Sequence, residues 1–229
     1  MNVTYIDHSA YFIEMIDRCF LFDWCKGSLP MWDHHKKLYV FVSHHHEDHY
    51  CPKIFDLRKE TDRIAYVLSD DIVCPMAADI TLVKGGEGFV LDDMKIETFP
   101  SSDEGVAFLI ETKGKTIYHA GDLNWWHWEG ENSEEENEEA KALFEKGIRP
   151  LKGRHIDVAF LVLDPRQGKQ FWYGMDAFMR MTHTDIIFPM HMWEEYTIIE
   201  KMKRLSFSGP YRDKIMDVTQ ENQQFTIEL

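Results

Sequence analysis

The chain is poor in cysteine and has no long apolar run. Only four of its 229 residues are cysteines (Cys19, Cys25, Cys51 and Cys74), and none form a Cys-x-x-Cys pair, so no disulfide framework is indicated and a reducing cytoplasm is expected. The apolar stretch Val158–Leu163 is far shorter than the roughly 20 residues that span a bilayer. The first residues lack the basic start and apolar core of a signal peptide. We therefore expect a cytoplasmic protein without a membrane partner.

Positive charge is also scarce. Lys plus Arg number 25 against 40 Asp plus Glu, which gives a formal net charge of −15. An acidic surface repels phosphate backbones, so nucleic acid is not the expected partner. The length and a 44% hydrophobic composition predict a globular chain that forms one domain over residues 1–229. Histidine, in contrast, is abundant: the chain has 12 histidines, and three of them are consecutive.

Short apolar runs separated by turn residues predict strands in the first half and alternating helices and strands later. The continuous apolar run Leu38–Val42 is typical of a strand buried on both faces. Further strands are expected at Val3–Ile6, Tyr11–Met15, Cys19–Phe22, Ile64–Leu68, Ile156–Leu163 and Ile186–Phe188, and helices at Lys53–Lys59, Ala140–Lys146 and Glu194–Lys203. Val3–Ile6 and Tyr11–Met15 should form a hairpin. This order predicts an α/β sandwich.

The histidine cluster directly follows the buried strand Leu38–Val42. It reads H-x-H-x-D-H and supplies His44, His46, Asp48 and His49. Alternate residues of an extended segment project to one side, so His44 and His46 can bind one metal while the following turn redirects the other two. Imidazole and carboxylate ligands suit zinc, manganese or iron. A histidine-rich surface patch is the alternative interpretation.

Three later segments offer further ligands at predicted strand ends. Asp122 follows Gly121 after one strand, His191 follows the strand Ile186–Phe188, and Asp103 lies in a loop just before a strand. Each is weak evidence alone. Their order along the chain makes the set specific, and we expect them to converge with the histidine cluster.

In this order the motifs resemble the metallo-β-lactamase-fold hydrolase superfamily. More narrowly, the chain is similar to the bacterial lactonase-like branch that includes L-ascorbate-6-phosphate lactonase. The segments that carry this narrower likeness are Phe41–His44, Asp103–Phe108, His119–Asn124 and Asp164–Arg166. The resemblance implies a four-layer αββα sandwich with one or two divalent metal ions at an edge between two sheets.

Position by position, the resemblance places His44 and His46 at the first metal, Asp48, His49 and His191 at the second, and Asp122 between them. The superfamily usually has a third histidine at the first metal, where this chain has Ser101-Ser102-Asp103. Asp103 is the expected substitute, with Ser102 as an alternative. Zinc is the expected metal. A carboxylate ligand also favours manganese or iron.

The residues after Asp122 predict a substrate pocket. Asn124, Trp126 and Arg166 are expected to bind the substrate, and His127 to transfer a proton, with Asp48 and Asp122 beside the metals as catalytic groups. The alternatives are loop packing for the aromatic residues and an ion pair with Asp164 for Arg166.

We expect a metal-dependent hydrolase in which a metal-bound hydroxide attacks a small anionic ester, lactone or phosphoester. One alternative is a phosphodiesterase or ribonuclease, against which the net charge of −15 argues. Another is a non-catalytic metal-binding protein, for which the missing histidine is the best argument. The sequence leaves a homo-oligomer open.

Overall fold

The computed structural model describes residues 1–228, and the chain divides into two compact units. Unit 1 comprises Met1–Lys84 and the C-terminal segment from Gln220 onward; unit 2 comprises Gly85–Thr219. Each unit contains one large sheet. No helix among the described residues is long and apolar enough to cross a membrane.

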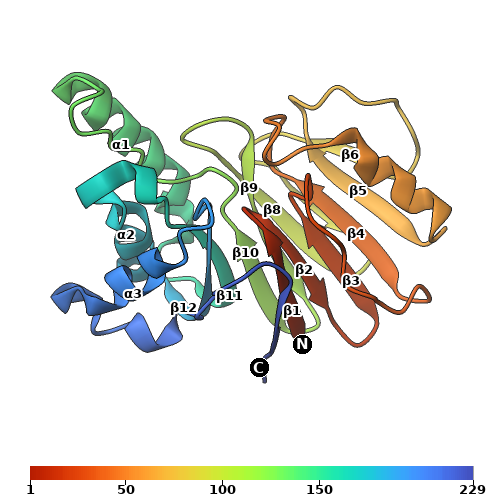
Figure 1. Cartoon of the computed structure of the whole chain (residues 1–229). Coiled ribbons are helices and arrows are strands. Elements are labelled where there is room, and N and C mark those ends of the chain that lie inside the picture. Colours follow the sequence, from red (N-terminus) through yellow and green to blue (C-terminus); the bar gives the residue numbers. More distant parts are fainter. Residues whose placement is uncertain (229) are drawn as a thin grey trace. The chain divides into compact units, whose positions relative to one another are not determined.

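Unit 1 is built on a seven-stranded sheet of order β13-β1-β2-β3-β4-β5-β6. Its strands are β1 (Asn2–Asp7), β2 (Ala10–Glu14), β3 (Arg18–Phe22), β4 (Lys37–Val42), β5 (Ile64–Ser69), β6 (Ile80–Val83) and β13 (Gln223–Thr226). The predicted hairpin is confirmed, since β1 and β2 pair antiparallel. The strands from β3 to β6 run parallel, in red to yellow in Figure 1.

Strand β4 is an interior strand of this sheet, between β3 and β5. Its side chains from Leu38 to Val42 are buried, as the continuous apolar run predicted. Phe22 of β3 pairs with Phe41, so the two parallel strands end side by side. The loops that follow them therefore start next to each other, which brings Asp23 beside Ser43.

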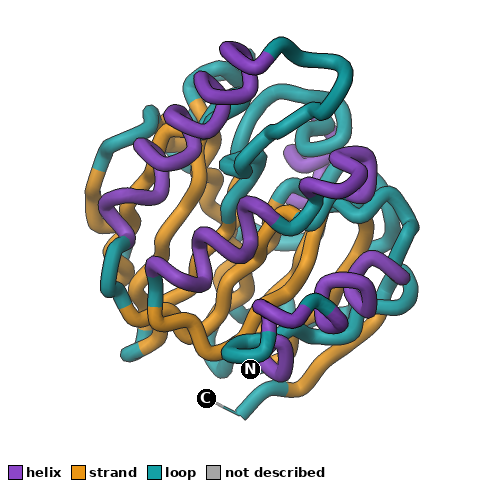
Figure 2. The backbone as a smooth tube through the Cα atoms, turned by 90° about the vertical axis from the view of Figure 1, so that its left-hand side faces the viewer, coloured by secondary structure: helices purple, strands orange, loops and turns teal. Residues whose placement is uncertain are grey.

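Unit 2 is built on a six-stranded sheet of order β12-β11-β10-β9-β8-β7. Its strands are β7 (Gly88–Leu91), β8 (Met94–Pro100), β9 (Val106–Thr112), β10 (Lys115–His119), β11 (His155–Val162) and β12 (His183–Met190). The strands from β7 to β10 pair antiparallel, whereas β10, β11 and β12 are parallel. The helices α1 (Glu134–Ile148), α2 (Tyr173–Met181) and α3 (Thr197–Arg204) lie in front of these strands in Figure 2.

The helix boundaries follow local chemistry. Helix α1 begins after Ser133, whose hydroxyl accepts from the Glu136 N–H while the Glu136 carboxylate accepts from the Ser133 N–H. This capping box and the acidic first turn, Glu134 to Glu136, explain why the helix begins here, ahead of the predicted Ala140. Helix α3 starts at Thr197 rather than at the predicted Glu194, because Glu194 has a positive φ of 62° that a right-handed helix excludes. The predicted helix over residues 53–59 is a 3₁₀ helix, η1 (Pro52–Lys59).

Candidate metal centre

Unit 1 gathers histidines where β4 ends. The rings of His44 and His49 are fully buried, with centroids 4.1 Å apart, and the His46 ring lies 4.6 Å from His44. A turn closed by the His49 N–H on the His46 carbonyl, at 2.9 Å, brings the last histidine back toward the first. The cluster is therefore a convergent group of imidazoles, in which the turn places His49 beside His44 rather than away from it.

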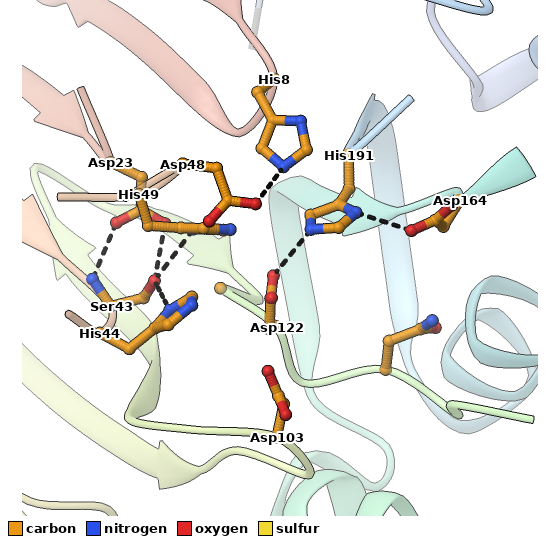
Figure 3. A network of polar contacts seen from close by, with 12 residues as sticks. His8, Asp23, Ser43, His44, Asp48, His49, Asp103, Asp122, Asp164 and His191 are labelled. Carbon is orange, nitrogen blue, oxygen red and sulfur yellow. Dashed lines mark hydrogen bonds and ion pairs between the residues drawn. The ribbon is translucent and has the colours of Figure 1, made fainter. Parts of the chain in front are cut away.

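A buried aspartate, Asp23, organises these rings. Its carboxylate accepts hydrogen bonds from the Ser43 N–H at 2.7 Å, the Ser43 hydroxyl at 2.7 Å and Nδ1 of His49 at 2.8 Å (Figure 3). The Ser43 oxygen also lies 2.9 Å from Nδ1 of His44. With both Nδ1 atoms engaged in this way, Nε2 is the nitrogen that each ring can offer to a metal.

Sequence reasoning missed Asp23. The signal was present, since it is an acidic residue directly after a buried strand, but its partners are 20 and 26 residues away.

His8 and Asp48 complete the group in unit 1. His8 sits in the turn between β1 and β2 with φ of 46°, and its Nε2 lies 3.4 Å from a carboxylate oxygen of Asp48. Its ring is 5.5 Å from that of His49, edge to face. One ligand atom from each of these three residues lies within 4.8 Å of the others. Asp48 therefore shares a side of the cluster with His49, as predicted.

Unit 2 brings the other predicted ligands together at the carboxyl ends of β10, β11 and β12. Because these strands are parallel and adjacent, Asp122, Asp164 and His191 all follow strand ends at one edge of the sheet. Nε2 of His191 lies 3.5 Å from Oδ1 of Asp122, and its Nδ1 lies 2.9 Å from Oδ2 of Asp164 (Figure 3). Within this unit, therefore, Asp122 and His191 lie side by side.

Asp164 accepts a hydrogen bond from Nδ1 of His191, as Asp23 does from Nδ1 of His49. It is fully buried, and burial alone would raise the pKa of its carboxyl. Hydrogen bonds from His191 and Arg166 outweigh that cost and hold the pKa below its ordinary value. Asp164 is therefore an ionised acceptor for Nδ1 of His191. Carboxylate–histidine pairs of this kind orient metal ligands.

Asp103 lies in the loop between β8 and β9 and is exposed. One of its carboxylate oxygens is within 4.8 Å of one from Asp122. Ser102, the alternative ligand, instead donates its hydroxyl to the Asn124 carbonyl at 2.5 Å and accepts from the Asn124 N–H at 3.0 Å. The hydroxyl of Ser102 thus anchors the loop after Asp122.

The donor chemistry fits a divalent cation. Three imidazoles have Nδ1 held by an aspartate or serine, and two carboxylates, Asp103 and Asp122, approach each other closely. Like charges at that spacing repel, and a cation between them would relieve the repulsion. Imidazole nitrogen with carboxylate oxygen is a ligand set for zinc, manganese or iron.

The residues predicted around the substrate differ in burial: Asn124 and Trp126 are buried, whereas His127 is partly exposed. Asn124 is 2% exposed and donates to Gln167 at 2.9 Å, so it supports the loop. Trp126 donates its ring N–H to the Asp122 carbonyl at 2.9 Å and its ring lies 5.6 Å from that of His191. His127 is partly exposed, against Tyr173.

Arg166 forms an ion pair with Asp164, which was the alternative to its expected role in binding substrate. Its Nη2 lies 2.6 Å from Oδ2 of Asp164, yet its side chain remains 47% exposed. The exposed part of the guanidinium is available to solvent.

Comparison with known proteins identifies the family. The sequence profile described as "Beta-lactamase superfamily domain" matches residues 2–138, and no protein of curated function matches the chain in sequence. Among solved structures, Igni18, a metallo hydrolase from the archaeon Ignicoccus hospitalis, is 17% identical over 100% of this chain and 98% of its own, with a TM-score of 0.62. The metallo-β-lactamase fold protein YhfI from Bacillus subtilis is 11% identical over 98% of each chain, with a TM-score of 0.62.

A third structure, the isothiocyanate hydrolase from Delia radicum gut bacteria, is 14% identical over 99% of each chain, with a TM-score of 0.56. At these identities the structures establish the fold alone. The two large sheets and these likenesses confirm the predicted fold class, the α/β metallo-β-lactamase fold. The profile covers more than half of the sequence, including the H-x-H-x-D-H motif and Asp122, and the chain therefore belongs to the beta-lactamase superfamily.

Proposed function

We propose that the protein is a metal-dependent hydrolase that acts as one domain over residues 1–229. The observation that carries this proposal is the orientation of His44, His49 and His191. Each ring has Nδ1 against a buried aspartate or serine, which prepares Nε2 for a metal. Membership of the superfamily and the metallo hydrolase among the similar structures support it.

The proposed ligands follow the resemblance to the superfamily. His44, His46 and Asp103 would bind a first metal, Asp48, His49 and His191 a second, and Asp122 would contact both. Zinc is the first choice. Manganese or iron are the alternatives, because Asp103 replaces an imidazole by a harder oxygen ligand. When bound, a divalent metal lowers the pKa of a coordinated water to about 7 and polarises the bond under attack.

The side chains around the ligands supply the remaining chemistry. Asp122 and Asp48 would orient the attacking water through their carboxylates. His127, partly exposed in the loop after Asp122, would donate a proton to the leaving group. Trp126, beside His191, would form a wall of the pocket, and Asn124 would hold the loop that carries both aromatic residues.

The proposed substrate is a small anionic ester, lactone or phosphoester. Arg166 supports this class, because only Nε and Nη2 of its guanidinium donate to Asp164. The Arg166 side chain is 47% exposed, and a guanidinium with free N–H groups is suited to a carboxylate or phosphate. Hydrolysis of a phosphorylated lactone, as in the lactonase-like branch, is the narrower form of this proposal. The net charge of −15 disfavours a long polyanion such as RNA.

The test combines metal analysis with a substrate panel. Purified protein is stripped with a chelator, reloaded with zinc, manganese or iron(II), and assayed on lactones, phosphodiesters and thioesters. We expect metal-dependent hydrolysis that Asp122→Ala reduces at least 100-fold, with thermal unfolding of the metal-free protein little changed. Asp93→Ala is the matched control, since Asp93 is an exposed aspartate of the same unit, between β7 and β8, that pairs with Lys113 and belongs to no cluster of possible metal ligands among the described residues. Full activity of Asp122→Ala with metal present would refute the assignment.

A further inference from the structure

Asp164 collects hydrogen bonds from three side chains. Arg166 donates its backbone N–H at 2.8 Å, Nε at 3.0 and 3.1 Å and Nη2 at 2.6 Å. Nδ1 of His191 donates at 2.9 Å, and the ring N–H of Trp193 lies at 3.4 Å. All of these converge on one carboxylate that is 0% exposed. Asp164 therefore connects the loop after β11 with the loop after β12.

The loop after β12 is held in an unfavourable backbone conformation. His191, Trp193 and Glu194 have φ angles of 65°, 52° and 62°, in the left-handed region that side chains other than glycine rarely adopt. Such residues persist only where the surrounding structure over-determines them. Two of the three donate side-chain hydrogen bonds to Asp164, which identifies this carboxylate as a main restraint on the loop.

Arg166 in turn restrains Asp164. Its guanidinium carbon lies 4.3 Å from the centroid of the Trp193 ring and 5.7 Å from that of Trp128. The planar fork donates through two nitrogens and stacks on an aromatic face at once, which a lysine ammonium cannot do. The guanidinium thus fixes both the carboxylate and the ring that share the loop with His191.

We propose that Arg166 is a positioning residue for the metal ligand His191 as well as the contact for the substrate anion. Its inner edge, Nε and Nη2, fixes Asp164. Asp164 then keeps the hydrogen on Nδ1 of His191 and leaves Nε2 for the metal. This inference rests on the proposed function for its metal. It adds that removal of Arg166 impairs metal binding, which a residue that only contacts substrate would not do.

The experiment compares four variants with the wild type. Asp164→Asn replaces the carboxylate by an amide of the same shape, Arg166→Ala removes the guanidinium, and Arg166→Lys keeps the charge without the fork. Arg180→Ala is the control, because Arg180 makes a similar ion pair with Asp176, Nε to Oδ2 at 2.7 Å, within helix α2. Zinc affinity and stoichiometry are measured by calorimetry on chelator-stripped protein.

For Asp164→Asn we expect one metal equivalent to bind about 10–100-fold more weakly, the usual effect of removing a partner of a metal-bound histidine. Arg166→Ala and Arg166→Lys should weaken the same equivalent by about tenfold. Arg166→Lys should also raise KM for an anionic substrate less than Arg166→Ala does, because the ammonium still attracts the anion. Arg180→Ala should match the wild type. Metal binding unchanged in both Arg166 variants would overturn the proposal.

A second readout works without metal and separates this inference from the proposed function. In protein labelled with ¹⁵N-histidine, the Nδ1–H resonance of His191 should be protected from exchange in the wild type. It should be lost in Asp164→Asn and should exchange faster in Arg166→Ala. If the wild type binds no metal, the proposed function fails, yet this pattern would still support the positioning role. Identical resonances in wild type and Arg166→Ala would refute that role.

Discussion

Removal of the Asp23 carboxylate should destabilise unit 1 and disable its histidines. Asp23→Ala leaves the Ser43 N–H, the Ser43 hydroxyl and Nδ1 of His49 without their buried acceptor. Hydrogen bonds to a charged group contribute about 1.5–3 kcal/mol each. Part of the hydrogen-bond energy lost in Asp23→Ala is offset, because folding no longer has to remove this 0% exposed carboxylate from water. Breaking one partner of a buried charged network costs about 3–5 kcal/mol, which we take as the expected loss.

Two matched variants make this prediction specific. Ser43→Ala removes only the hydroxyl and should cost about 1 kcal/mol. Asp23→Asn keeps the shape and tolerates the φ of 44° at this position. Its amide can accept from Ser43, but an NH₂ facing Nδ1 of His49 favours the opposite tautomer. Asp23→Asn should therefore fold nearly normally and lose metal affinity.

Urea unfolding of the metal-free proteins measures the stabilities, and zinc calorimetry measures the affinities. Both are compared at one pH and ionic strength. If Asp23→Ala is no less stable than Ser43→Ala, the carboxylate does not organise the cluster. If Asp23→Asn binds zinc like the wild type, Asp23 does not set the tautomer of His49.

Three further predictions concern other sites. Asp103→Ala should weaken one metal equivalent and Asp103→His should strengthen zinc binding, as followed by metal titration with stoichiometry; identical curves would remove Asp103 from the ligands. Hydrogen bonding to Arg154 lowers the pKa of Glu97 from 4.5 to about 2, so the stability that this carboxylate contributes is present above pH 4.5 and is lost as the pH falls toward 2. Because Glu97 is partly exposed, we expect this contribution to be about 1–2 kcal/mol. The free energy of unfolding should therefore fall less between pH 7 and pH 3 in Arg154→Ala than in the wild type, and an equal fall in both proteins would contradict the prediction. Gly174→Ala should lower the melting temperature, because a Cβ there would lie 1.8 Å from Oδ1 of Asn124; an unchanged melting temperature would mean that the Asn124 loop can move.

Local patterns in the sequence predicted many of the strands and helices of the fold. The apolar run Leu38–Val42 predicted the central buried strand because burial on both faces requires apolar residues at every position. The two apolar runs Val3–Ile6 and Tyr11–Met15 predicted the first hairpin, and the helix expected at Ala140–Lys146 lies within α1. Boundaries were less certain where backbone strain intervened, as at Glu194, since no residue pattern reports a positive φ at a non-glycine position.

The sequence by itself determined which residues could be metal ligands. Imidazole and carboxylate groups are recognisable as residue types, and their spacing at 44–49 placed four of them on one short segment. Only the tertiary structure decided how these groups are held. Asp23 reaches His49 across 26 residues, and Asp164 reaches His191 across 27, because parallel strands end side by side regardless of their separation in the chain. The tertiary structure also decided the contacts of Arg166, which pairs with Asp164 and stacks on Trp193, because the parallel strands β11 and β12 end side by side.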